Sequence, residues 1–450
     1  MTSTKNIILR YLEPICVFIA VLLLLHAVTY MYSIGYIKDV LRDYPIFPTL
    51  LNILPQTYWA GLTILLVLSM HIILKCNKRC SKIFILIAIF LILLYIPLLS
   101  ELIEVNPRFW DTYWPAGETR TVIRNGHIDL ISPRPINSYH IWPVYHLIIS
   151  FYNKIFQLPL LTTIKLGYVY MWICFIIIAY NLGINLTKNP LIAFIFTLLL
   201  ISSYWPVFHL YPATLSTLYY ISMLAMLWKY LFIRDSAKEE ICIIIIFSTL
   251  VLEHSRTPLV GIIMPLVITL VYFTLNKSKN NINYQKIYRR LYNIVLIMVI
   301  IYIVFYNSIA IGLLAKGLNE ILCQLFNMEP TESMTMQVAS VIHATGRKLS
   351  IAIRATQIFL YSLTAIALLL SQKRTRGSSQ FLILWIISIG FVALWGYRMP
   401  ILSLPKIWLL LSIPLSMFIA FMCKRRKSFL IFLTIIAIIF APLTRYIDGH

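Results

Sequence analysis

Residues 83–100 read IFILIAIFLILLYIPLLS, a run of 18 residues without a charged side chain. About 20 apolar residues let an α-helix cross the hydrocarbon core of a bilayer, so this run predicts a transmembrane helix. Similar runs recur from one end of the chain to the other. We predict about thirteen transmembrane helices, at about residues 12–33, 49–74, 83–100, 160–184, 190–206, 213–232, 241–253, 257–275, 291–314, 351–370, 379–396, 405–422 and 428–445.

The composition is typical of a chain that is surrounded by lipid. Of the 450 residues, 60% are hydrophobic and 12% are charged, whereas about 25% of the residues in soluble domains are charged. No segment between the apolar runs is long enough to bury a separate core. We therefore expect an all-α polytopic membrane protein in which residues 1–450 form a single transmembrane domain.

The basic residues indicate the orientation. Lys and Arg number 38 against 16 Asp and Glu, and they gather in short clusters between apolar runs. Cytoplasmic loops carry such clusters, whereas nucleic-acid binding requires a continuous basic face. We predict a cell-membrane protein with its N-terminus in the cytoplasm, its C-terminus outside and no nucleic-acid partner. The clusters that fall inside are Lys75–Lys82, Lys277–Arg290, Lys373–Arg376 and Lys424–Lys427.

This orientation requires that the apolar segment from His140 to Leu158 does not cross the membrane. The segment contains Pro143 and several aromatic residues, including Trp142 and Tyr145. Aromatic rings favour the headgroup level, so we predict an interfacial helix. The alternative is a short span with different pairing of the neighbouring helices. With the interfacial helix, the outer loops are residues 101–158 and 315–350.

The first outer loop is rich in carboxylates. It holds five of the 16 acidic residues: Glu101, Glu104, Asp111, Glu118 and Asp129. Asp111 stands among aromatic residues in FWDTYW, where partial desolvation would raise its basicity into the range of a general base. For Glu118, an ion pair in solvent with nearby arginines is the simpler interpretation.

Four patches of the chain resemble the GT-C superfamily of membrane glycosyltransferases, which use polyprenyl-phosphate-linked sugars. They are FWDTYWPAGETRTVIRNGHID, YHIWPVYHLI, FHLYPATLSTLYY and LEHSRTPLVGII. Unlike oligosaccharyltransferases, the chain has no large soluble C-terminal domain, and it places two extra spans before the outer loop.

The resemblance implies transfer of a sugar, with inversion, from a polyprenyl-phosphate donor to a lipid-linked or cell-surface glycan on the extracytoplasmic face. It implies Asp111 as the base and Glu104 as the reserve candidate. Membrane lipids are the further expected partners.

The departing lipid phosphate needs positive charge, and the planar guanidinium of Arg can make paired hydrogen bonds to phosphate oxygens. We predict that His254 and Arg256 bind it in one outer turn and Arg398 in another, with Arg347 as a further candidate. Alternatively, Arg256 forms an ion pair with Glu253, and Arg398 is an interfacial anchor.

No Asp-x-Asp motif or adjacent acidic pair occurs in the outer loop, so we expect no tightly bound cofactor. A divalent metal is the open alternative, because some GT-C relatives use one. Two other functions compete: a lipid-linked polysaccharide polymerase or ligase, and a multi-pass transporter or flippase. A transporter should show repeats and ionisable residues at mid-membrane, and the predicted spans contain few such residues.

Overall fold

The computed structural model describes residues 2–33, 54–75, 82–96, 98–99, 103, 113–128, 142–203, 212–233, 236–254, 257–279, 282–308 and 404–422, with single residues and short groups between 383 and 389 and between 428 and 438. Every regular element in this part of the chain is a helix. The longer helices are α1 (Thr2–Ser33), α4 (Gln56–Lys75), α5 (Lys82–Tyr95), α7 (Tyr113–Asn125), α8 (Val144–Phe156), α9 (Leu160–Thr187), α10 (Pro190–Ser203), α11 (Pro212–Phe232), α12 (Ala237–Glu253), α13 (Thr257–Lys279), α14 (Ile282–Ser308) and α19 (Leu404–Met422).

Four helices are long and apolar enough to cross a membrane: Pro14–Ser33, Gln56–Leu74, Leu160–Thr187 and Gln285–Ser308. Shorter apolar helical segments occur in α5, α10, α13 and α19. Helices also overlap ten of the thirteen predicted spans. The other three, at 351–370, 379–396 and 428–445, lie wholly or mainly outside the described residues. The described part of the chain is therefore a helical bundle with several helices suited to a membrane.

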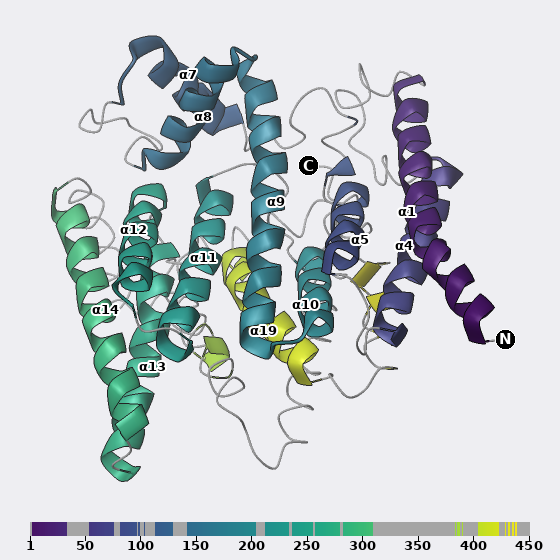
Figure 1. Cartoon of the computed structure of the whole chain (residues 1–450). Helices are drawn as coiled ribbons and strands as arrows, with labels where there is room; N and C mark the ends of the chain where they lie inside the picture. Colours follow the sequence, from purple (N-terminus) through teal and green to yellow (C-terminus); the bar gives the residue numbers. More distant parts are fainter. Residues whose placement is uncertain are drawn as a thin grey trace, which may run out of the picture.

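The helices pack mainly against neighbours in the sequence (Figure 1). α11 packs against α12, α13 against α14 and α1 against α4, while α9 contacts both α10 and α11. α5 contacts α10 and α9, and so connects the N-terminal helices to the rest. In Figure 1, α7 and α8 lie together at one end of the bundle, beside the first turns of α9.

The connection between α9 and α10 follows from three consecutive residues. Lys188 adopts a left-handed conformation with φ of 55° and ends α9. The Asn189 Oδ1 then accepts hydrogen bonds from the backbone N–H groups of Leu191, at 2.9 Å, and Ile192, at 3.3 Å. Pro190 begins α10, where its missing N–H would have no helical partner. The two helices thus turn back on each other within a few residues.

Basic residues hold the end of the bundle opposite to α8. The Arg290 guanidinium donates to the carbonyl oxygens of Tyr230 and Leu231, at 3.3 and 3.4 Å, and so binds the C-terminus of α11. The Lys229 Nζ lies 2.8 Å from the Glu239 Oε1. A cation at a helix C-terminus compensates the partial negative charge of the last carbonyl groups. These contacts join α11, α12 and α14 at one end.

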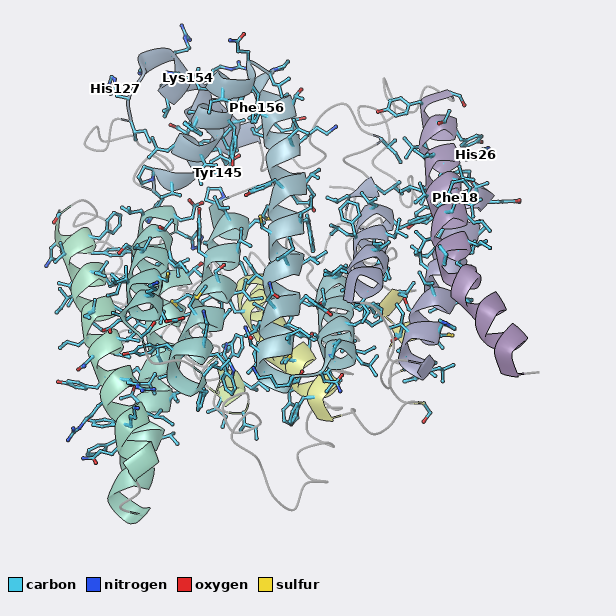
Figure 2. The ribbon with its side chains drawn as sticks, in the orientation of Figure 1. Phe18, His26, His127, Tyr145, Lys154 and Phe156 are labelled. Atoms are coloured by element: carbon cyan, nitrogen blue, oxygen red, sulfur yellow. The ribbon has the colours of Figure 1, made fainter. Side chains whose placement is uncertain are left out.

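The segment predicted to be interfacial forms α8, whose 13 residues extend about 20 Å at 1.5 Å per residue. That length is less than the roughly 30 Å of a bilayer core. Its aromatic residues divide between two faces, because Tyr145 is completely buried and Phe151 is 62% exposed. Figure 2 shows Tyr145 on the side of α8 toward the bundle and Lys154 on the far side. α8 therefore covers one end of the bundle with an amphipathic helix.

Candidate functional site

Most of the predicted site residues lie outside the described part of the chain. This applies to Asp111, Glu104, Arg256, Arg347 and Arg398. Of the six, the structure describes His254, which follows α12 directly. The candidate site is therefore built from His254 and its surroundings, and the roles of the other five residues remain predictions.

The imidazole of His254 caps the first turn of α13. Its Nδ1 accepts a hydrogen bond from the backbone N–H of Thr257 at 3.2 Å and lies 2.9 Å from the Thr257 Oγ1. A backbone amide can only donate, so Nδ1 is the acceptor and the proton of a neutral imidazole is on Nε2. His254 is buried, with 6% of its surface exposed. Nε2 is then the ring atom that could donate a hydrogen bond to a phosphate oxygen.

A second hydrogen bond continues this network to α11. The Ser216 Oγ lies 2.9 Å from the Thr257 Oγ1, and both side chains are buried. The turn between α12 and α13 is thus bound to the first turns of α11. Because these helix ends meet below α8, the turn that carries His254 has a fixed position relative to that helix.

Glu253, the residue before His254, has a completely buried side chain. Within the described residues, neither carboxyl oxygen has a partner of good hydrogen-bond geometry. The backbone N–H of Tyr145, in the first turn of α8, approaches the carboxyl group. Nearly all buried polar groups in native proteins are hydrogen-bonded, so an exception requires an explanation, such as a role in binding or catalysis.

The hydroxyl group of Tyr145 lies within the electrostatic field of Glu253. Burial raises the pKa of this hydroxyl above its ordinary value, and the negative charge of Glu253 raises it further. Tyr145 therefore stays protonated at physiological pH and can donate a hydrogen bond.

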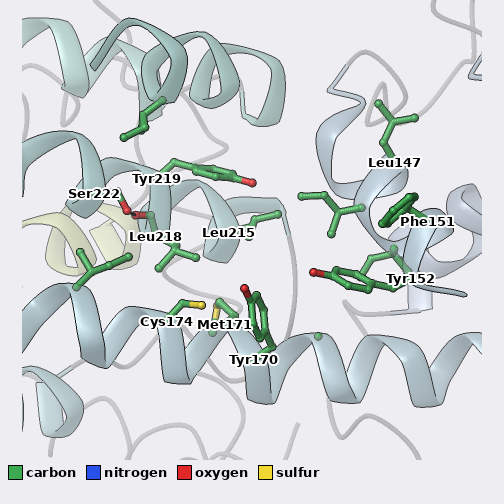
Figure 3. A pocket seen from close by; sticks show the side chains of 15 residues that line it. Leu147, Phe151, Tyr152, Tyr170, Met171, Cys174, Leu215, Leu218, Tyr219 and Ser222 are labelled. Carbon is green, nitrogen blue, oxygen red and sulfur yellow. Dashed lines mark hydrogen bonds between the residues drawn. The ribbon is translucent and has the colours of Figure 1, made fainter. Parts of the chain in front are cut away.

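A cavity of about 820 Å³ lies between α8, α9 and α11 (Figure 3). The first of its lining residues is Leu147, two residues after Tyr145 in the sequence. Its volume is within the roughly 300–1,000 Å³ that is typical of small-molecule sites. The walls are mainly apolar, which suits a ligand with a hydrocarbon portion. They include Leu147, Phe151, Met171, Leu215, Leu218 and Ile246.

Three tyrosines supply the main polar groups of this cavity. Figure 3 shows the hydroxyl groups of Tyr152, Tyr170 and Tyr219 directed into the same space, from α8, α9 and α11 respectively. Tyr219 is within electrostatic range of Glu253 as well as of the other two tyrosines. The cavity thus combines mainly apolar walls with three converging hydroxyl groups.

The helix of the first outer loop is bound to α8. The Thr119 Oγ1 of α7 lies 2.9 Å from the His146 Nδ1 of α8 and donates to the carbonyl oxygen of Pro115 at 2.8 Å. Thr119 and His146 are both completely buried. Since α7 begins two residues after Asp111 in the sequence, this contact connects the predicted catalytic loop to the helix that covers the cavity.

In the described part of the chain, no group of three or more His, Cys, Asp or Glu side chains is placed to hold a metal ion. Asp111 and Glu104, the two loop carboxylates predicted to be catalytic, lie outside that part. A divalent metal therefore remains an alternative that involves those residues.

A scan of protein-family models and a search of curated proteins gave no match to this chain. The resemblance to the GT-C superfamily rests on the four sequence patches alone.

The sequence prediction did not include the tyrosine cluster, and it treated Glu253 as a partner for Arg256. A signal was present for Glu253, because it is a rare carboxylate at the end of an apolar run, and such residues usually serve a function. No comparable signal exists for Tyr170 and Tyr219, which are separated by about fifty residues and meet only after folding.

Proposed function

We propose that this chain is an integral membrane glycosyltransferase that transfers a sugar from a polyprenyl phosphate to a lipid-linked or cell-surface glycan on the extracytoplasmic face. In this proposal the chain has thirteen spans, its N-terminus is cytoplasmic, and α7 and α8 belong to the outer loop. The observation that carries the proposal is the cavity beneath α8, which combines apolar walls with the hydroxyl groups of Tyr152, Tyr170 and Tyr219.

The cavity supports a donor that is half lipid and half sugar. Apolar residues such as Leu215 and Leu218 suit a hydrocarbon chain, and the tyrosine hydroxyls suit the polar part where the chain ends. Ligand sites commonly combine an apolar lining with a few convergent polar groups. A fully polar substrate would leave most of this lining unused.

In the proposed reaction, the bond between the sugar C1 and the phosphate oxygen breaks while a bond forms between C1 and an acceptor hydroxyl oxygen. Asp111 takes the hydroxyl proton, with Glu104 as the reserve base. The electron pair of the broken bond leaves on the phosphate, and Arg256, Arg347, Arg398 and the Nε2–H of His254 stabilise that charge. Attack from the face opposite to the phosphate inverts the sugar carbon.

Transfer from a radiolabelled polyprenyl-phosphate sugar into an extractable acceptor tests this proposal. Membranes that contain wild type, Asp111→Asn or Arg398→Ala are compared at equal protein level. Loss of a general base lowers the rate by about 10²- to 10⁴-fold, which is the expected effect of Asp111→Asn. The matched control is Glu118→Gln in α7, whose partly exposed side chain we expect to be dispensable. If Asp111→Asn retains full activity, Asp111 is not the base.

A further inference from the structure

We infer that the hydroxyl groups of Tyr152, Tyr170 and Tyr219 bind the phosphate group of the donor lipid. This inference rests on the proposed function and assigns the residues that hold the phosphate of the donor. The structural basis is geometric: all three side chains line the cavity beneath α8, and Figure 3 shows their hydroxyl groups directed into the same space.

A ligand can reach all three tyrosines. Tyr170 is 58% exposed, and Tyr152 and Tyr219 are partly exposed. The lining also includes Leu147 and Phe151 of α8, which are both exposed and apolar. Exposed apolar patches of this kind are typical of surfaces that contact a membrane. A ligand can therefore enter the cavity from the bilayer, with its hydrocarbon part against the apolar walls.

Ring contacts fix the position of one tyrosine relative to another. The ring centroids of Tyr152 and Tyr170 are 6.5 Å apart, and Tyr152 also stacks on Phe156 at 5.9 Å. This pair joins α8, which covers the cavity, to α9, which forms one of its walls. Tyr219 directs its hydroxyl group toward them from α11 (Figure 3). Each of the three helices thus contributes one hydroxyl group to the same space.

These hydroxyl groups have unused hydrogen-bonding capacity. Within the described part of the chain, the hydroxyl groups of Tyr152 and Tyr219 have no hydrogen-bond partner. Tyr170 bonds to the thiol of Cys174, which is a weak partner that a ligand could replace. Because each phenol can donate one hydrogen bond, the cluster offers three donors to a ligand in the cavity.

The lining favours a phosphate over a sugar at this position. The unesterified oxygens of a phosphate are strong acceptors, so converging donors match them. Sugar hydroxyl groups also donate, and carboxylate or amide oxygens are the usual side-chain acceptors for them. Among the described residues that line the cavity, none is Asp, Glu, Asn or Gln. Hydrogen bonds to a charged acceptor are also the stronger ones, which favours the phosphate further.

The competing explanation is that these are ordinary interfacial tyrosines. Tyrosine is enriched where a membrane meets water, and its hydroxyl group can then bond to water alone. That explanation predicts that removal of a hydroxyl group leaves the affinity for lipids unchanged. The phosphate-binding role predicts a loss of affinity that requires the phosphate and does not depend on the sugar.

The test measures binding to purified full-length protein in nanodiscs. The probes are farnesyl phosphate, farnesyl phosphate linked to glucose, and farnesol, which lacks the phosphate. Tyr219→Phe removes the hydroxyl group and keeps the ring. It should lose about 10- to 100-fold in affinity for both phosphate-bearing probes, the value of a hydrogen bond to a charged group, and keep its affinity for farnesol. Tyr152→Phe and Tyr170→Phe should behave in the same way. The matched control, Tyr292→Phe at an exposed position of α14, should keep all three affinities.

A second measurement leaves the tyrosines unchanged and locates the probe. Cys174 lines the cavity and its thiol is free. In a background that retains binding and has no other cysteine, bound farnesyl phosphate should slow the alkylation of Cys174 by N-ethylmaleimide. Equal rates with and without the bound probe would overturn the inference, because the lipid would then lie elsewhere.

The outcomes separate the two proposals. If wild type binds neither phosphate-bearing probe, the proposed function fails. If it binds them and the three Phe variants bind them equally well, the tyrosine site is refuted while the proposed function stands. A loss confined to the glucose-linked probe, or an equal loss for farnesol, would also refute it, because the hydroxyl groups would then act on the sugar or on the hydrocarbon. Inorganic phosphate should not displace farnesyl phosphate, since it makes no use of the apolar walls. Displacement would indicate a site for free phosphate instead of a lipid.

Discussion

The backbone N–H of Tyr145, in the first turn of α8, approaches the buried carboxyl group of Glu253 at the last residue of α12. This contact brings together two elements that are about a hundred residues apart in the sequence. Below it lie the ends of α11 and α13, joined by the hydrogen bond between Ser216 and Thr257. The junction thus links α8 to the turn between α12 and α13 and, through that turn, to α11.

The buried carboxyl group of Glu253, which has no good hydrogen-bond partner among the described residues, should reduce the stability of the protein. We expect Glu253→Met to raise the free energy of unfolding by about 1 kcal/mol, because it removes a polar group buried without good partners. Thermal unfolding in detergent measures this change. A loss of stability greater than about 1 kcal/mol would instead indicate that Glu253 serves the packing of α8.

Filling the cavity should block the lipid. Leu218 lines the cavity from α11, and Leu218→Trp places a much larger side chain there. We expect at least a 10-fold loss of affinity for farnesyl phosphate. Leu296→Trp on α14, where the leucine is 47% exposed, is the matched control and should bind normally. Equal binding by the two variants would show that the lipid does not occupy the cavity.

The approach of α9 to α10 depends on Gly183. A Cβ atom at this position would lie 2.8 Å from the Cα of Ala193 in α10, closer than real Cβ contacts allow. Gly183→Ala should therefore destabilise the protein by about 1–3 kcal/mol, the typical cost of overpacking. Gly117→Ala in α7 is the control, because its Cβ meets nothing within 4 Å. It should be neutral or stabilising by up to about 1 kcal/mol, since Ala favours helix more than Gly does. Thermal unfolding of both variants distinguishes them.

Single cysteines test the proposed orientation. In a cysteine-free background that retains function, Lys154→Cys on α8 and Arg289→Cys on α14 both place a thiol at an exposed position. A membrane-impermeant maleimide added to intact cells should label position 154, and position 289 only after permeabilisation. The reverse pattern would place α8 in the cytoplasm and remove the proposed extracytoplasmic site.

The sequence predicts the positions of the described apolar helices because apolar runs of the right length are direct evidence of spans. The limits of some helices differ from the predicted limits for a physical reason. α14 begins at Ile282, whereas the apolar run begins near residue 291, because the polar turns before the span also form helix. α12 likewise begins at Ala237, ahead of its apolar part. Hydropathy detects the part of a helix that lipid surrounds and not the part beyond it.

The candidate site was less predictable from the sequence. His254 was selected because a polar residue in a short outer turn is unusual, whereas its use of Nδ1 to cap α13 depends on the exact path of the turn. The convergence of Tyr152, Tyr170 and Tyr219 depends on how three helices pack. Each of these tyrosines, taken alone, is an ordinary residue for a membrane helix.

The most direct test of the glycosyltransferase proposal follows the fate of the donor in liposomes that contain the purified protein. The donor is a polyprenyl phosphate with a radiolabelled sugar, and an extract of cell-surface glycolipids supplies the acceptor. The proposal predicts that the label moves from the donor to the acceptor while an equal amount of free polyprenyl phosphate forms. Movement of the intact donor between the two leaflets, with no free polyprenyl phosphate, would contradict it and indicate a flippase.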